Sequence, residues 1–176
     1  MKRKCVLVTL ALGVSSLAAM TGAGWLGGYR INLTPSYPIG LWRIVPLDHE
    51  PQVGDLIFIC PPPTKPFLAA LERGYLRSGL CLGGFAPLIK IIAATEGQDV
   101  VIAHGVTVDG RLLPHSEVRS LDGAGRPLRA FAGGMVPAGY LLVHSDYEAS
   151  YDSRYFGSIL ASGLLGRAQP IFTIKP

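Results

Sequence analysis

The chain has 176 residues, which is enough for one domain with its own hydrophobic core. It carries 16 Lys and Arg residues against 12 Asp and Glu residues, a formal net charge of +4. Three of the cations, Lys2, Arg3 and Lys4, precede the first apolar segment, so the charges of the remainder nearly balance. The composition therefore does not indicate a basic nucleic-acid-binding face.

The first predicted element is an apolar helix. No charged residue occurs from Cys5 to Tyr29, and roughly 20 apolar residues suffice to cross a bilayer as a helix. The basic residues before it favour a cytoplasmic N-terminus, which exports the rest of the chain. Residues 1–29 are interpreted as a retained membrane anchor or, because "SLAAM" offers small residues for cleavage, as a removed signal peptide. Either alternative predicts a periplasmic location for residues 30–176.

Residues 30–176 have the pattern of a mostly β domain, with short apolar segments separated by Gly and Pro. We expect a β-barrel or β-sandwich with no second domain. One short helix is expected at 66–76, and a flexible loop at 119–134. Asp109-Gly110 is a hairpin signal. The expected strands are 40–45, 54–60, 87–94, two within 99–113, 139–145 and 169–174.

Two cysteines bound an irregular segment of the exported part. Cys60 and Cys81 enclose residues 60–81, which we interpret as a helical insertion. Disulfides form and persist outside the cytoplasm, so a disulfide clamp is expected; two unpaired buried thiols are the alternative. Neither a CxxC pair nor paired histidines lie nearby, so we expect no zinc site, and no other metal or cofactor.

Two separated residues have the chemistry of a nucleophile and its base. Ser36 lies between Pro35 and Pro38, which restrict the backbone. Lys90 lies within the apolar run "PLIKII". Burial lowers the pKa of a lysine, and a neutral amine can act as a general base for a serine hydroxyl. Taken singly, Ser36 is read as a turn residue and Lys90 as an outward-facing lysine on a strand.

A third polar group follows an apolar strand, in "HSDYEASYDSRYFG" at 144–157. Ser150 can orient a lysine amine, and Asp152 can form an ion pair with Arg154. A solvated loop is the alternative. A histidine base such as His144 is disfavoured because Ser36 has no GxSxG elbow around it, and His144 is expected to orient the loop instead.

Taken together, these segments resemble the type I signal peptidases, which are membrane-bound serine–lysine proteases. The resemblance is closest to their TraF branch, the peptidases of conjugative plasmid transfer. It covers nearly the whole exported part. The segments that carry it, in chain order, are "PSYPIGLWR", "VGDLIFI", "PLIKIIAATEGQDV", "VPAGYLLVHSD" and "SYDSRYFGSI".

The resemblance implies a role for each polar residue. Ser36 matches the nucleophile and Lys90 the general base. Ser150 matches the serine that orients the lysine, and Asp152 and Arg154 match the supporting ion pair.

A further role implied by the resemblance concerns the oxyanion. Thr34 stands where general signal peptidases carry an oxyanion-hole hydroxyl, beside the backbone N–H of Ser36. Two departures from those enzymes favour the TraF branch. The second proline comes one residue earlier than in "PSMxPT", and "HSDY" replaces the usual "GDNR".

The expected function is that of a periplasmic serine endopeptidase held at the inner membrane. The TraF resemblance implies a pilin precursor as substrate, trimmed near its C-terminal side and in some cases cyclised. It also implies other conjugative transfer proteins as partners. No direct nucleic-acid binding is expected, because the charges of the exported part nearly balance. A general signal peptidase, a non-catalytic component of the mating-pair apparatus and a soluble serine–lysine repressor protease are the alternatives.

Overall fold

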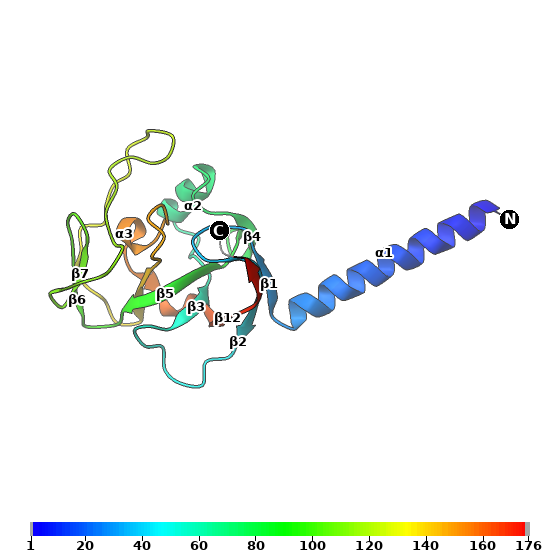
Figure 1. Ribbon diagram of the computed structural model, residues 1–176, viewed down its shortest axis with the longest axis horizontal. Coiled ribbons are helices and arrows are strands. Elements are labelled where there is room, and N and C mark those ends of the chain that lie inside the picture. Colours follow the sequence, from blue (N-terminus) through cyan, green and yellow to red (C-terminus); the bar gives the residue numbers. More distant parts are fainter. Residues whose placement is uncertain (1, 175–176) are drawn as a thin grey trace.

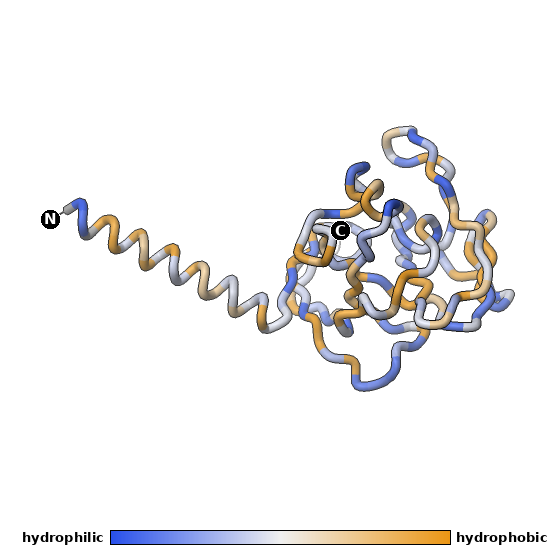
Figure 2. The backbone as a smooth tube through the Cα atoms, turned by 180° about the vertical axis from the view of Figure 1, so that it is seen from behind, coloured by the Kyte–Doolittle hydropathy of each residue, from blue (hydrophilic) through white to orange (hydrophobic). Residues whose placement is uncertain are grey.

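The computed structural model describes residues 2–174. Its first element is α1 (Lys2–Leu26), a long helix that projects away from the β-rich part of the chain (Figure 1). Within it, Val6–Leu26 is long and apolar enough to cross a membrane, and no part of this window is buried against the protein. Figure 2 shows hydrophilic colour at its N-terminal end and mostly apolar or neutral residues along the rest. A signal sequence passes the same test, so both sequence alternatives stand.

The remainder consists mainly of antiparallel β-strands, confirming the expected fold class. The larger sheet has the order β1-β2-β12-β3-β5-β10-β11. Its strands, in that order, are Tyr29–Asn32, Ile39–Val45, Leu164–Ile174, Leu56–Ile59, Leu88–Ala94, Tyr140–His144 and Ile159–Leu160.

A smaller four-stranded sheet has the order β8-β7-β6-β9. Its strands are Arg111–Leu112, Val106–Val108, Asp99–Ile102 and Gly134–Met135. Asp109 and Gly110 connect β7 to β8, with φ of 49° and 76°. Two successive residues with positive φ are what a type I′ hairpin turn needs, so the predicted hairpin is present.

The main core lies beneath the centre of the larger sheet. Its buried side chains include Ile57 and Ile59 of β3, Ile92 of β5, and Leu141 and Val143 of β10. Such burial stabilises by roughly 1.5–3 kcal/mol for each large aliphatic side chain. Lys90 of β5 pairs with Ile57 of β3. Because β5 lies between β3 and β10, the lysine is on an interior strand of the sheet.

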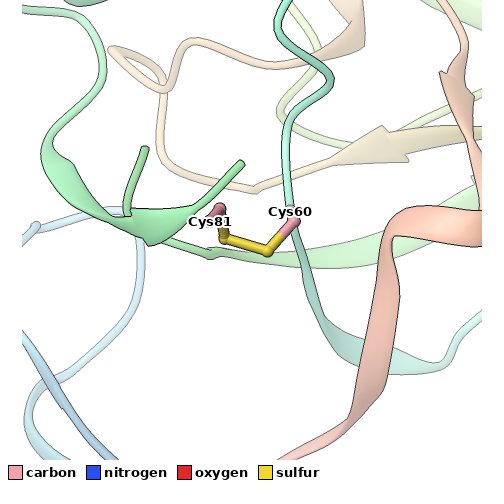
Figure 3. The surroundings of a disulfide bond; sticks show 2 residues. All are labelled: Cys60 and Cys81. Atoms are coloured by element: carbon pink, nitrogen blue, oxygen red, sulfur yellow. A yellow bond between two sulfur atoms is a disulfide. The ribbon is translucent and has the colours of Figure 1, made fainter. Parts of the chain in front are cut away.

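The insertion carries α2 (Lys65–Glu72) and the short strand β4 (Ser78–Cys81). Cys60 and Cys81 are joined by a disulfide, as Figure 3 shows. The helix anchors the insertion by burying Phe67 and Ala70. It ends earlier than the expected residue 76, because Gly74 takes up a φ of 78° that an α-helix cannot contain.

The segment 119–134 has little regular structure, as its glycines suggest, but hydrogen bonds tie it to the insertion. The Tyr75 hydroxyl donates to Asp122 at 2.6 Å, and Arg126 donates to the same carboxylate oxygen. Two short helical elements that the sequence did not predict, α3 (Ser153–Phe156) and η1 (Ala161–Gly163), complete the described part.

Candidate active site

Asn32 holds the loop that contains Ser36. Its side-chain amide donates to the carbonyls of Thr34, Tyr37 and Pro38 at 2.9–3.1 Å. Its Oδ1 accepts from both the backbone N–H and the hydroxyl of Thr34, at 3.0 and 2.7 Å. One side chain at the end of β1 therefore braces the backbone on both sides of Ser36.

Lys90 is buried in the middle of β5, with 3% of its surface exposed. Its Nζ donates to the Ser150 hydroxyl at 2.5 Å. Burial lowers the pKa of Lys90 to about 8; the negative charge of Asp152 opposes this shift and the positive charge of Arg154 adds to it. About one lysine in ten is then neutral at pH 7, against about one in three thousand for an ordinary lysine.

Asp152 and Arg154 form a buried bidentate ion pair. Arg154 Nε and Nη2 donate to the two carboxylate oxygens at 2.8 and 2.9 Å. Asp152 caps α3 by accepting from the Arg154 N–H. Burial opposes ionisation of Asp152, but the nearby His144 ring, the hydrogen bonds from Arg154 and the positive charges of Lys90 and Arg154 together hold its pKa well below the usual range. The remaining guanidinium donors reach backbone carbonyls, including that of Ser150 at 3.2 Å.

A groove of about 450 Å³ connects these elements at the surface. Thr34, Ser36 and Lys90 all line it. Residues 30–36 form one part of its wall; residues 74–78 of the insertion and residues 86–90, which lead into and begin β5, form others. Ser150, Asp152 and Arg154 are not among its lining residues; they lie buried behind Lys90. An extended peptide entering the groove would meet both the serine and the lysine.

Two buried residues that precede Asp152 complete the surroundings of the site. His144 Nδ1 lies 3.5 Å from Asp152 Oδ2, and the ring does not line the groove. Ser145 donates its hydroxyl to the carbonyl of Ser36 at 2.8 Å. Sequence reasoning did not identify Asn32 or Ser145 as site residues. The one available signal for Ser145 was its place in a polar triplet directly after an apolar strand.

No metal site is found among the described residues. Among residues 2–174, no group of three or more His, Cys, Asp or Glu side chains is placed to hold a metal ion.

The match to the family model for signal peptidases, peptidase S26, spans residues 2–173. The chain is 52% identical over 173 residues to a probable conjugal transfer protein TraF of Sinorhizobium fredii, covering 98% of this chain and 92% of the relative. It is 50% identical over 176 residues to the conjugal transfer protein TraF of Agrobacterium tumefaciens, covering 100% of both chains.

Among solved structures, the chain resembles a signal peptidase I from Enterococcus faecalis. The identity is 22% and the TM-score 0.41, covering 68% of this chain and 97% of that chain. The family match and the two relatives, which are about half identical over nearly full length, show that the chain belongs to the peptidase S26 family of signal peptidases.

Proposed function

We propose that the protein is a serine–lysine endopeptidase in which Ser36 is the nucleophile and Lys90 the general base. The observation that carries this proposal is the buried Lys90 amine, with its lowered pKa, lining the same groove as Ser36. Neutral Lys90 takes the hydroxyl proton as Ser36 Oγ attacks a peptide carbonyl. The resulting ammonium gives that proton to the leaving amine as the acyl-enzyme forms.

The oxyanion of the tetrahedral intermediate needs donors on the Ser36 side of the groove. The Ser36 backbone N–H and the Thr34 hydroxyl are the proposed pair. In the structure the Thr34 hydroxyl donates to Asn32 Oδ1. Stabilising the oxyanion therefore requires the Thr34 hydroxyl to turn from Asn32 to the substrate.

Ser150, Asp152 and Arg154 have supporting roles in this proposal. Ser150 accepts a hydrogen bond from Lys90 and orients the amine. The carboxylate of Asp152 favours the ammonium form of Lys90, and Arg154 disfavours it. Because the two charges shift the lysine pKa in opposite directions, their effects partly cancel, and the pKa stays where both protonation states are accessible.

The proposed substrate is the precursor of a conjugative pilin, processed at the periplasmic face of the inner membrane. Two relatives are named as conjugal transfer proteins, and the resemblance to the TraF branch implies a pilin substrate. Residues 1–29 are the proposed anchor or signal segment and 30–176 the peptidase domain. Since α1 ends at Leu26, at most about 35 Å of extended chain separates Ser36 from the helix end. This spacing suits a precursor that is itself held in the membrane.

The test is mass spectrometry of the pilin from conjugating cells that carry wild-type protein, Ser36→Ala, Lys90→Ala or Lys90→Arg. We expect mature pilin only with wild type. The arginine variant is the sharpest, because it keeps the positive charge but cannot accept a proton. Normal pilin in Lys90→Arg cells would remove Lys90 from the role of base.

The same cells separate the alternative functions. Loss of signal-peptide cleavage from many exported proteins in the Ser36→Ala strain would favour a general signal peptidase. Undiminished plasmid transfer in that strain, together with lost transfer in a deletion strain, would favour a non-catalytic scaffold.

A further inference from the structure

Ser145 links the nucleophile loop to the buried aspartate across a long stretch of sequence. It is fully buried, with 0% of its surface exposed. Its hydroxyl donates to the Ser36 carbonyl at 2.8 Å, a contact between residues 109 positions apart. Its backbone N–H donates to Asp152 Oδ2 at 3.2 Å. One residue thus touches both the backbone of the proposed nucleophile and the ion pair behind the proposed base.

The hydrogen bond from Ser145 holds a carbonyl of the Ser36 loop that Asn32 does not hold. The Asn32 amide holds the carbonyls of Thr34, Tyr37 and Pro38. The Ser36 carbonyl is not one of these three, and it accepts from the Ser145 hydroxyl instead. Rotation of the Ser36–Tyr37 peptide would turn the Ser36 backbone and move Oγ relative to Lys90. The bond from Ser145 opposes that rotation.

We infer that Ser145 is a positioning residue that fixes the Ser36 backbone in register with Asp152 and thereby aims the nucleophile at Lys90. This inference rests on the proposed serine–lysine mechanism. It gives Asp152 a second effect besides its charge. Through the Ser145 backbone N–H, Asp152 also fixes the residue that holds Ser36. Misplacing a reacting group by about 1 Å can cost on the order of 100-fold in rate.

Ser145 also has a structural contact, because its hydroxyl accepts from the Tyr147 N–H at 3.3 Å. A matched control is therefore needed, and Ser116 supplies it. Ser116 is a buried serine whose hydroxyl donates to the Leu113 carbonyl at 2.7 Å and accepts from the Val106 N–H at 3.0 Å. Its bonds are of the same kind as those of Ser145, but they lie at the smaller sheet and do not reach the loop that contains Ser36. Like Ser145, Ser116 does not line the groove.

The experiment measures kcat and KM of the full-length protein in detergent micelles, with the pilin precursor of the same conjugative system as substrate. The variants are Ser145→Ala, Ser145→Cys and Ser116→Ala. Ser145→Cys keeps the side-chain size but replaces the hydroxyl by a weak donor, so it remains informative if the alanine variant folds poorly.

Both Ser145 variants should lower kcat by about 10- to 100-fold and leave KM within about 3-fold, since the groove wall is unchanged. The pH at half-maximal rate should stay that of wild type, because Lys90 keeps its surroundings. Ser116→Ala should keep wild-type kcat. Combining Ser145→Ala with Asp152→Asn should cost less than the product of the single effects, because both changes weaken the hold of Ser145 on the Ser36 carbonyl.

Wild-type kcat in both Ser145 variants would overturn the inference, as would an equal loss of kcat in Ser116→Ala. A rise in KM with unchanged kcat would also overturn it, by assigning Ser145 to substrate binding. These failures are distinct from failure of the proposed function, which would appear as full activity in Ser36→Ala or Lys90→Arg.

Discussion

Replacing Lys90 by methionine should change the stability of the protein more favourably at neutral pH than in alkali. Methionine has a similar length and no charge. The pKa of Lys90 is about 8 in the folded protein against an ordinary value of 10.5, because burial disfavours the ammonium. A difference of this size corresponds to about 3 kcal/mol of unfolding free energy.

The direction follows from proton binding. Below pH 8 the lysine is protonated in both the folded and the unfolded state, so wild type bears the full cost of the buried ammonium. Between pH 8 and 10.5 the unfolded state binds more protons, and wild-type stability rises with pH. Above that window both states are neutral and the cost is gone. The unfolding free energy of Lys90→Met relative to wild type should therefore fall by about 3 kcal/mol from pH 7 to pH 10.5.

Urea unfolding of the full-length proteins in micelles, followed by the fluorescence of buried Trp42, measures this difference. Lys90→Met also loses the hydrogen bond to Ser150. That loss changes the difference in unfolding free energy between the two proteins by the same amount at every pH, so it does not alter the pH dependence. Lys65→Met, at an exposed position of α2, corrects for the removal of a surface lysine. A stability difference that stays constant from pH 7 to 10.5 would refute the buried, readily deprotonated lysine. It would do so without any assumption about substrate.

Three further predictions concern the loop, the ion pair and the insertion. Asn32→Asp keeps the acceptor oxygen but loses the amide that donates to three carbonyls. Its free energy of unfolding in urea should fall by about 3 kcal/mol, and its kcat should fall at least about 10-fold. An unchanged kcat would contradict the bracing role. Asp152→Asn removes the partner of Arg154 and should cost about 3–5 kcal/mol. It should also move the pH–rate profile to lower pH, because Asp152 raises the lysine pKa; a shift to higher pH would be inconsistent with this. Replacing both Cys60 and Cys81 by serine opens a loop with a sequence separation of 21 and should lower the free energy of unfolding by about 3 kcal/mol. It should also raise KM, because the insertion lines the groove. Thiol labelling of denatured, non-reduced wild type should find neither cysteine free.

The elements that could be predicted from the sequence are those governed by neighbouring residues. The uncharged run from Cys5 to Tyr29 was enough for a long apolar helix, and α1 occupies most of it. Asp109-Gly110 was enough for a hairpin, because positive φ is a local property. The expected helix of the insertion is present but shorter than its predicted range, since the positive φ of Gly74 ends it.

The candidate site was only partly accessible in this way. Ser36 and Lys90 had ordinary explanations when taken singly, and only their order within a family pattern joined them. The burial of Lys90 depends on β5 lying between β3 and β10 in the middle of the larger sheet, which no local pattern around residue 90 specifies.

Asn32 and Ser145 show what sequence reasoning missed. Ser145 reaches Ser36 because β10 ends where the loop between β1 and β2 passes, which brings together residues 109 positions apart. Hydrogen bonds of this kind depend on which strands become neighbours, and strand order is set by burial of the whole core rather than by any short segment. The residue types therefore indicated the kind of chemistry, whereas the relative placement of Ser36, Lys90 and the Asp152–Arg154 ion pair depends on how the strands assemble.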